Sequence, residues 1–245
     1  MAQLNEYMTK HLLFIDIETA TQKEDLFKND SDATHNDLWK AKAANLKNEE
    51  NLDWTQLYFE RAAIFPEFGK VICISVGAIW KSGSGEQGVY KAKVKTFCGV
   101  DERDTLYQFF DFIAGYDHTK LVMVAHNGKE FDFPYLCKRG IINDLEIPHT
   151  LRIAGKKPWE ILHQDTLELW RFGDRSWTSL ALLCFALGIE SPKETMDGSQ
   201  VSQAYWNGEI GKVCDYCKED VVALIQCWLK INMYPTISLE NIVRV

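Results

Sequence analysis

The spacing of hydrophobic and polar positions along the chain predicts its strands and helices. The run LLFIDI, which begins at Leu12, is apolar on both of its sides, as is typical of a central strand covered on both faces. Its side chains form two sets: Leu12, Phe14, Asp16 and Glu18 on one side, and Leu13, Ile15 and Ile17 on the other. Two acids therefore end an apolar strand, where an unpaired buried carboxylate is costly.

The elements that follow predict a mixed sheet. Residues 70–80 and 89–99 form a hairpin around the Gly-rich turn 81–88, and Asp101 can cap the next helix. Short strands at 121–127 and within 161–169 then alternate with helices at 131–140, 179–188 and 215–231. The helix at 131–140 is expected to end at Gly140. An antiparallel start followed by parallel strands with helical crossovers predicts an α/β fold class.

Residues 20–68 differ from the rest because they are polar and rich in Asp, Asn and Lys. Two helical patterns are present, near 34–47 and 53–63. We expect one domain over residues 1–245, with this segment as a partly helical insertion that covers or borders the functional site. Its first part is expected to be mobile.

Composition and charge narrow the class of protein. The 245 residues are 46% hydrophobic and 25% charged, which is ordinary for a soluble globular protein. No apolar run approaches the roughly 20 residues of a membrane span, and no signal-peptide pattern is present, so we expect a cytoplasmic location. A net charge of −8 argues against broad wrapping of nucleic acid. It is compatible with an acidic metal site whose cations attract one strand end.

The seven cysteines are scattered through apolar segments, which indicates reduced thiols packed in a core. Cys214 and Cys217 form a C-x-x-C pair. A zinc or redox role would need a second ligand pair or a suitable context, and the sequence shows neither.

Single acidic patterns in this chain carry little information. Asp-x-Glu occurs a second time as Asp144–Leu145–Glu146, in a polar turn before Pro148. Tyr-x-x-x-Asp also occurs a second time, with Tyr107 and Asp111. Only a combination of motifs is therefore specific.

Three motifs combine. Asp16 and Glu18 end the first strand, HNGKEFDFPYL contains Asp132 at a strand-to-helix turn, and YCKED places Tyr216 and Asp220 one helical turn apart. At an effective dielectric of about 20, two carboxylates 4–7 Å apart repel by roughly 2–4 kcal/mol. Converging acids would therefore need cations among them, and oxygen ligands favour Mg²⁺ or Mn²⁺.

In this order, FIDIET, HNGKEFDFPYL and YCKED resemble the three motifs of the DEDD 3′–5′ exonucleases. The tyrosine resembles the DEDDy subgroup, and N-x-x-x-F-D resembles the proofreading domains of family B DNA polymerases. SLALLCFALGIESPKETMDGSQV is similar to stand-alone bacterial relatives of those domains. The resemblance covers residues 11–230 apart from 20–68, and it implies a ribonuclease H-like fold.

The resemblance also implies catalytic roles around two metal ions. Asp16 would bridge both ions, Glu18 and Asp220 would help hold the ion that binds the attacking water, and Asp132 would hold the second ion. Tyr216 would orient the water or assist its deprotonation. A phenol with a reference pKa near 10 is a poor base, so orientation is favoured.

Other residues are candidates for substrate contacts. Thr19, Asn127 and Phe131 are expected to bind the substrate. Candidates for stacking on bases are Phe131, Tyr135, Trp177 and Trp206, and candidates for gripping phosphates are Lys129, Arg152, Lys156, Lys157 and Lys193. Ordinary alternatives are a hydrophobic core for the aromatic residues and a solvated loop for the basic ones.

Three polar residues near the motifs have structural alternatives. Asp132 could cap the helix that follows it, as Pro134 near the helix start suggests. His126 fits a structural role better than that of a general base. Asp165 is interpreted as a local cap rather than a metal ligand.

The predicted reaction is metal-dependent hydrolysis of the terminal phosphodiester at a single-stranded 3′ end, which releases nucleoside 5′-monophosphates. DNA is favoured over RNA by the likeness to polymerase proofreading domains, and the chain would act as a free-standing repair or trimming enzyme. The alternatives are an RNA 3′-end processing exoribonuclease and a catalytically inactive nucleic-acid-binding protein of the same fold.

Overall fold

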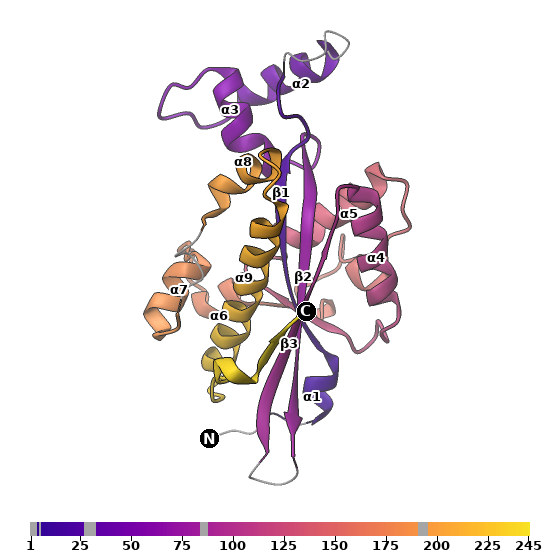
Figure 1. Ribbon diagram of the computed structural model, residues 1–245, viewed down its shortest axis with the longest axis vertical. Helices are drawn as coiled ribbons and strands as arrows, with labels where there is room; N and C mark the ends of the chain where they lie inside the picture. The colour runs from indigo at the N-terminus through magenta and orange to yellow at the C-terminus, as the bar shows by residue number, and fades with distance from the viewer. Residues whose placement is uncertain (1–3, 5, 27–32, 84–87, 191–195) are drawn as a thin grey trace.

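A six-stranded sheet forms the centre of the protein in the computed structural model, which describes residues 4, 6–26, 33–83, 88–190 and 196–245 (Figure 1). The strand order is β5-β4-β1-β2-β3-β6. The strands are β1 (Leu12–Thr21), β2 (Gly69–Ser82), β3 (Val89–Cys98), β4 (Val122–Ala125), β5 (Gln164–Asp165) and β6 (Ile242–Arg244). The β1–β2 and β2–β3 pairs are antiparallel, whereas β1–β4, β4–β5 and β3–β6 are parallel. This arrangement confirms the predicted α/β fold class with its antiparallel start.

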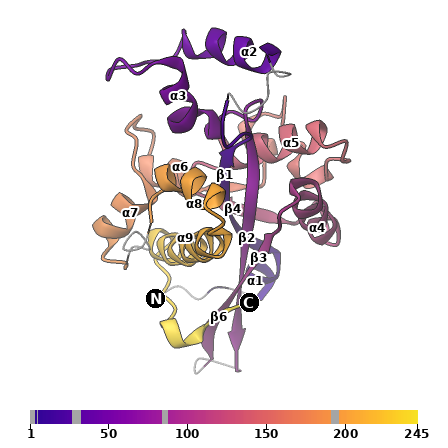
Figure 2. The same ribbon diagram turned by 45° about the horizontal axis from the view of Figure 1, so that its top comes forward.

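Helices cover both faces of the sheet. The α-helices are α1 (Glu6–His11), α2 (Ala33–Ala43), α3 (Trp54–Arg61), α4 (Glu102–Ala114), α5 (Asp132–Ile142), α6 (Thr166–Arg171), α7 (Leu180–Leu187), α8 (Val201–Trp206) and α9 (Ile210–Ile231). The short 3₁₀ helices are η2 (Ala62–Ile64), η4 (His149–Leu151), η5 (Pro158–Glu160), η7 (Gly198–Gln200) and η8 (Leu239–Asn241). Figure 2 shows α9 end-on against one face and α4 on the opposite side of the strands. In the part of the chain that the structure describes, no helix has the length and apolar character needed to cross a membrane.

The side chains on the two sides of β1 pack in two different hydrophobic clusters, as the apolar pattern of the strand predicts. Leu13, Ile15 and Ile17 pack in the cluster that contains the buried residues of α4 and α5. Phe14, on the other side, packs edge-on against Trp228 of α9 with ring centroids 5.6 Å apart. Because Asp16 and Glu18 share the side of Phe14, their side chains are directed to the layer that contains α9.

One helix end differs from the prediction. The helix α5 continues through Gly140 to Ile142, and Asn143 is its C-terminal cap. Gly140 is buried, and a Cβ there would lie 2.8 Å from Phe110, so the glycine permits close packing rather than ending the helix. The left-handed position after the helix is taken by Asp144.

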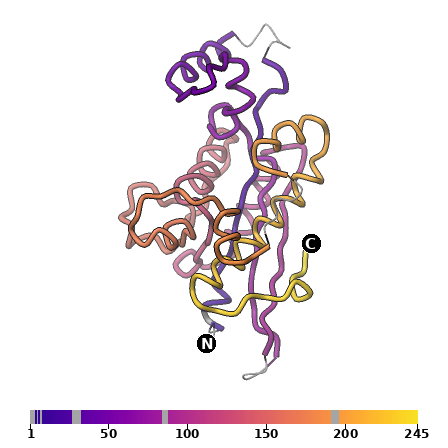
Figure 3. Tube along the Cα trace, turned by 90° about the vertical axis from the view of Figure 1, so that its left-hand side faces the viewer, coloured from indigo at the N-terminus to yellow at the C-terminus, as the bar shows by residue number. Residues whose placement is uncertain are grey.

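The segment between β1 and β2 contains two helices, α2 and α3, close to the patterns predicted at 34–47 and 53–63 (Figure 3). These helices have their own apolar cluster, in which Trp39 and Tyr58 are fully buried. Residues 27–32, in the part predicted to be mobile, lie outside the described residues.

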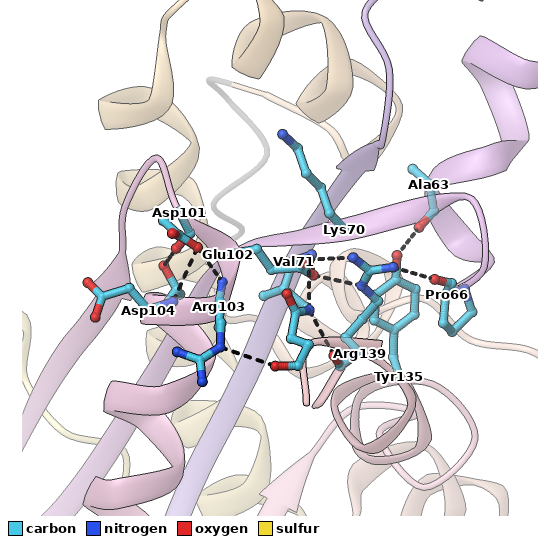
Figure 4. Close-up of polar contacts among 12 residues, drawn as sticks. Ala63, Pro66, Lys70, Val71, Asp101, Glu102, Arg103, Asp104, Tyr135 and Arg139 are labelled. Carbon is cyan, nitrogen blue, oxygen red and sulfur yellow. Dashed lines mark hydrogen bonds and ion pairs between the residues drawn. The ribbon is translucent and has the colours of Figure 1, made fainter. Parts of the chain in front are cut away.

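A buried ion pair connects the helices of one face to the start of β2 (Figure 4). Arg139 of α5 forms a bidentate contact with Glu102 of α4, and its Nη1 donates to the carbonyl of Pro66 over 2.8 Å. The backbone N–H of Val71 donates to Glu102 over 2.7 Å. This network fixes α5, and therefore Asp132 at its start, relative to the central strands.

Candidate active site

The carboxyl ends of the parallel strands β1, β4 and β5 lie at the same end of the sheet. The β1–β4 pairing ends where Phe14 faces Val124, and β4 itself ends at Ala125, while β1 continues to Thr21. Asp16 and Glu18 therefore lie on a stretch of β1 that is paired only with β2. In open α/β sheets, ligands bind outside the carboxyl ends of the strands, which is where these acids lie.

Three carboxylates converge at this place. Asp16, Glu18 and Asp220 each offer one oxygen, and these oxygens all lie within 4.8 Å of one another. Among the described residues, no other group of three or more His, Cys, Asp or Glu side chains meets this spacing. The structure thus brings together two acids from β1 and one from α9, about 200 positions apart in the sequence.

The approach of α9 to the sheet depends on a glycine in β2. A Cβ at Gly77 would lie 2.8 Å from side-chain atoms of both Val221 and Ile225 on α9. Only a residue without a side chain allows this spacing. The position of Asp220, one residue before Val221, follows from this contact.

Asp132 approaches from the other helical layer. It is the first residue of α5, 3% exposed, and its Oδ1 has no hydrogen-bond partner among the described residues. The alternative role as helix cap does not hold, since Phe131 occupies the cap position. A Cβ at Gly128 would lie 3.4 Å from Asp132 Oδ2, so the turn before α5 passes close to this carboxylate.

Burial disfavours negative charge at Asp16, Glu18 and Asp132, and neighbouring acids add to this effect at Asp16 and Glu18. The pKa values of Asp16 and Glu18 are raised well above the usual range, first by burial and then by neighbouring groups that include Asp220 and Asp132. Burial raises the pKa of Asp132 to about 7. A bound cation would reverse this effect, because opposite charge favours the ionised carboxylates.

Tyr216 lies one turn before Asp220 on α9 and is 6% exposed. Its pKa is raised by burial and by the charges of Asp220 and Glu18. The phenol therefore keeps its proton at ordinary pH, which suits a hydrogen-bonding role and not that of a base.

Cys217 contacts the same site, although the sequence identified it only as one member of the C-x-x-C pair with Cys214. Its Sγ lies 3.5 Å from both the backbone oxygen and Oδ2 of Asp16. The thiol is fully buried. The contact depends on how α9 is rotated against β1, for which the sequence carries no direct signal.

The predicted substrate-binding residues lie close to the acids along the chain, since Thr19 follows Glu18, and Asn127 and Phe131 precede Asp132. The β1–β2 register shifts between Glu18 and Thr19, where the partner changes from Cys73 to Val71. Such irregularities redirect side chains at strand ends and are common next to active sites. Asn127 adopts a left-handed conformation with φ of 63° in the turn before α5, and Phe131 is half-buried at the start of that helix.

Asp165 organises the turn that leads to Asp132. Its carboxylate accepts hydrogen bonds from the backbone N–H groups of Leu167, Asn127 and Lys129 at 2.9, 2.8 and 3.2 Å. The first of these caps α6, as predicted. The other two hold the β4–α5 turn, a role that sequence reasoning missed because it depends on β4 and β5 being neighbours.

His126 has both ring nitrogens engaged. Nε2 donates to the carbonyl of Thr178 over 2.8 Å, and Nδ1 lies 2.9 Å from the hydroxyl of Thr166. Burial lowers its pKa, so the ring is neutral near pH 7. These contacts agree with the predicted structural role.

The exposed fraction of each side chain tests the residues proposed to stack on bases. Tyr135 is 2% exposed and donates to the carbonyl of Ala63 over 2.8 Å, so its prediction as a stacking platform is wrong. Trp177 is 61% exposed. Trp206 is half-buried and donates to Thr21. Lys193 lies outside the described residues.

The second copies of the acidic patterns stay at the surface, away from the converging carboxylates. Asp144 and Glu146 are exposed in the turn after α5. On α4, Tyr107 is 55% exposed and Asp111 is exposed as well. Their separation from the site agrees with the prediction that a single pattern is not specific.

The C-x-x-C pair has cysteine neighbours that the sequence did not reveal. Cys214 and Cys217 pack in one cluster with Cys73, and Cys73 lies directly opposite Cys98 across the β2–β3 ladder. All seven cysteines are free thiols. These four do not meet the metal-ligand spacing of the acidic group.

The arrangement of sheet, helices and acids defines a ribonuclease H-like exonuclease fold. A solved structure of the family B DNA polymerase from the hyperthermophilic archaeon Pyrobaculum calidifontis matches with a TM-score of 0.53 and 17% identity, over 91% of this chain and 24% of that one. At this identity the match shows the fold alone, and the chain spans about a quarter of the polymerase.

A family model described as "Predicted 3'-5' exonuclease related to the exonuclease domain of PolB" matches residues 66–241. The chain belongs to this family, which confirms the resemblance noted in the sequence and the class of enzyme. The match contains Asp132, Tyr216 and Asp220, while Asp16 and Glu18 precede it. None of the curated proteins compared with the chain matches it.

Proposed function

We propose that the protein is a metal-dependent 3′–5′ exonuclease that removes nucleoside 5′-monophosphates from single-stranded 3′ ends. The observation that carries the proposal is the convergence of Asp16, Glu18 and Asp220 within 4.8 Å. Family membership supports degradation of the strand in the 3′-to-5′ direction. The likeness to a family B DNA polymerase favours DNA over RNA as the substrate.

The residues present fit a pair of Mg²⁺ or Mn²⁺ ions. The donor set consists of carboxylate oxygens, which hard divalent cations prefer, and the buried Oδ1 of Asp132 lacks a partner among the described residues. Asp16 would be the shared ligand, Glu18 and Asp220 would hold one ion, and Asp132 the other. When bound, such a pair supplies an activated water and stabilises the leaving oxygen.

The protein's own groups would position the reactants. Tyr216 would hold the attacking water through its hydroxyl, since its raised pKa keeps the phenol protonated. Thr19, Asn127 and Phe131 would contact the terminal nucleotide from the strand end and from the β4–α5 turn. Asp165 would keep that turn in place through its two backbone hydrogen bonds.

Residues 1–245 are proposed to form a single exonuclease domain with an insertion near 20–68. Contacts at the base of the insertion support this proposal. The backbone N–H of Gln22 donates to the carbonyl of Phe68 over 2.9 Å, and that of Lys23 donates to the hydroxyl of Tyr58 over 3.2 Å. The insertion would therefore border the carboxyl end of β1, where the acids lie.

The test is cleavage of single-stranded oligonucleotides labelled at the 5′ or the 3′ end, with Mg²⁺, Mn²⁺ or EDTA. The 5′-labelled strand should give a ladder that shortens from its 3′ end, and EDTA should abolish it. Asp16→Asn should remove the activity, while Asp144→Asn, an exposed acid, should not. Absence of a ladder with either ion on both DNA and RNA would contradict the proposal. Faster cleavage of RNA would instead indicate an RNA-processing enzyme.

A further inference from the structure

A groove of about 780 Å³ lies beside α5, the helix that begins at Asp132. Its floor is apolar and includes Pro134, Ile141 and Ile147. Its rim carries four cationic side chains, Lys129, Lys138, Arg152 and Lys156, and one carboxylate, Glu168. The groove thus has a local excess of positive charge, although the net charge of the chain is −8.

Two of the four cations are available for a ligand. Lys129 is paired with Glu168 at 2.6 Å, and Arg152 lies 3.3 Å from Glu146. Lys138 and Lys156 are exposed and have no ion-pair partner among the residues that the structure describes. The rim therefore presents uncompensated positive charge.

The groove begins at the turn and the first residues of the helix that carries Asp132. Lys129 belongs to the β4–α5 turn, whose Gly128 approaches Asp132 Oδ2. Pro134 follows Asp132 by two residues. Figure 4 shows Tyr135 and Arg139 of α5 directed to the 63–71 segment. Pro134, Lys138 and Ile141 follow i, i+4, i+7 spacing and form a different stripe of the same helix, which lines the groove.

We propose that this groove binds the nucleotides on the 5′ side of the terminal one, as a single strand, and this inference rests on the proposed exonuclease function. The lysines match the charge of the phosphates, and the apolar floor can accept sugars and bases. A second cavity, of about 810 Å³, has the opposite character, because its lining contains five acids against the single guanidinium of Arg103. The acids are Asp101, Asp104, Asp111, Asp144 and Glu146. That surface repels a phosphate backbone, so the strand is directed along α5.

The experiment measures strand binding without cleavage. A 5′-fluorescent oligonucleotide is titrated with the protein in EDTA, and anisotropy is recorded at several salt concentrations. The variant Lys138→Gln/Lys156→Gln is compared with Lys91→Gln/Lys93→Gln on β3, which β1 and β2 separate from β4. Lys138, Lys156 and Lys93 are exposed and Lys91 is half-buried. Equal melting temperatures would show that folding is preserved.

Loss of two phosphate contacts should lower the slope of log Kd against log salt by about 1.4, and raise Kd roughly tenfold or more at 0.1 M salt. The β3 variant should match wild type. The loss should grow with strand length, from roughly 4 to roughly 12 nucleotides, as the groove becomes filled. A slope and a Kd that are unchanged in the α5 variant, or reduced equally in both variants, would overturn the inference.

Failure of this inference and failure of the proposed function would be distinct. Because binding is measured in EDTA, the slope can change whether or not the protein hydrolyses the strand. Normal 3′ cleavage with an unaltered salt slope in the Lys138→Gln/Lys156→Gln variant would overturn only the groove assignment. If wild type cleaves no strand but the Lys138→Gln/Lys156→Gln variant has a reduced salt slope, only the catalytic assignment would be overturned.

Discussion

The thiol of Cys217 donates to Oδ2 of Asp16 over 3.5 Å, so a side chain of α9 contacts one carboxylate of the acidic group directly. The same sulfur lies 3.5 Å from the backbone oxygen of Asp16. Both contacts fix the orientation of the side chain on which the proposed metal site depends. Groups that orient ligands in this way commonly affect metal binding as strongly as some ligands do.

Cys217→Ala should weaken Mn²⁺ binding by about tenfold, because the donor that orients Asp16 is lost. Cys217→Ser keeps a donor at nearly the same place and should retain most of the affinity. Isothermal titration of Mn²⁺ into each variant gives the comparison. Equal affinities for the alanine variant and wild type would show that the contact has no orienting role.

Asp132→Asn should stabilise the metal-free protein in a pH-dependent way. The folded-state pKa is raised to about 7, whereas an unfolded aspartate titrates near 4. In wild type, the contribution of Asp132 to the free energy of unfolding is therefore complete below about pH 4 and is lost as the pH rises through 7. Asp132→Asn lacks this titration. The difference in free energy of unfolding between the variant and wild type should therefore increase over the same pH range, to roughly 2–4 kcal/mol.

Urea denaturation in EDTA at pH 4, 6 and 8 measures this difference for Asp132→Asn. Asp144→Asn is the matched control, since Asp144 is exposed and its substitution should give no comparable pH dependence. A constant difference between Asp132→Asn and wild type across the pH range would contradict the assigned direction of the shift.

Tyr216→Phe should reduce kcat by roughly tenfold, much less than Asp16→Ala, because only the orientation of the water is lost. The pH dependence of kcat should keep its shape, since the phenol stays protonated in wild type. Rates on a single-stranded oligonucleotide from pH 6 to 9 test both points. A variant as active as wild type would exclude the orienting role.

Gly77→Ala should destabilise the protein by about 1–3 kcal/mol, because the new methyl group would overlap Val221 and Ile225. The displacement of α9 should also lower activity, since Tyr216 and Asp220 move with it. Gly198→Ala is the control, as a Cβ there meets nothing within 4 Å. Thermal melts and cleavage assays on both variants give the comparison. Equal behaviour of the two would show that the close approach at Gly77 does not position the site.

Much of the fold could be predicted because its signals are local. The two-sided apolar pattern of β1 and the hairpin of β2 and β3 follow from residue types within each segment. A short strand was predicted within 161–169, where β5 covers two residues, whereas β6 was not predicted because three residues are too few for a period to be detected. Gly140 misled the prediction because the packing against Phe110 that requires it involves a distant residue.

The site, like the fold, could be predicted where its signals are local in the sequence. The acids could be identified from motif spacing, and three of them do converge. The contacts that hold them in place join segments far apart in sequence, as with Cys217 and Asp16 or Asp165 and the turn at Asn127. Such contacts depend on helix rotation and strand order, which single-sequence patterns do not encode.

The most direct test of the central claim is anomalous diffraction from crystals soaked in Mn²⁺. We expect manganese peaks between Asp16, Glu18 and Asp220, with a second peak toward the buried Oδ1 of Asp132. Crystals of Asp16→Asn should show weakened or absent peaks under the same soak. Wild-type crystals in which the four carboxylates point apart and bind no manganese would contradict the proposed metal-dependent mechanism.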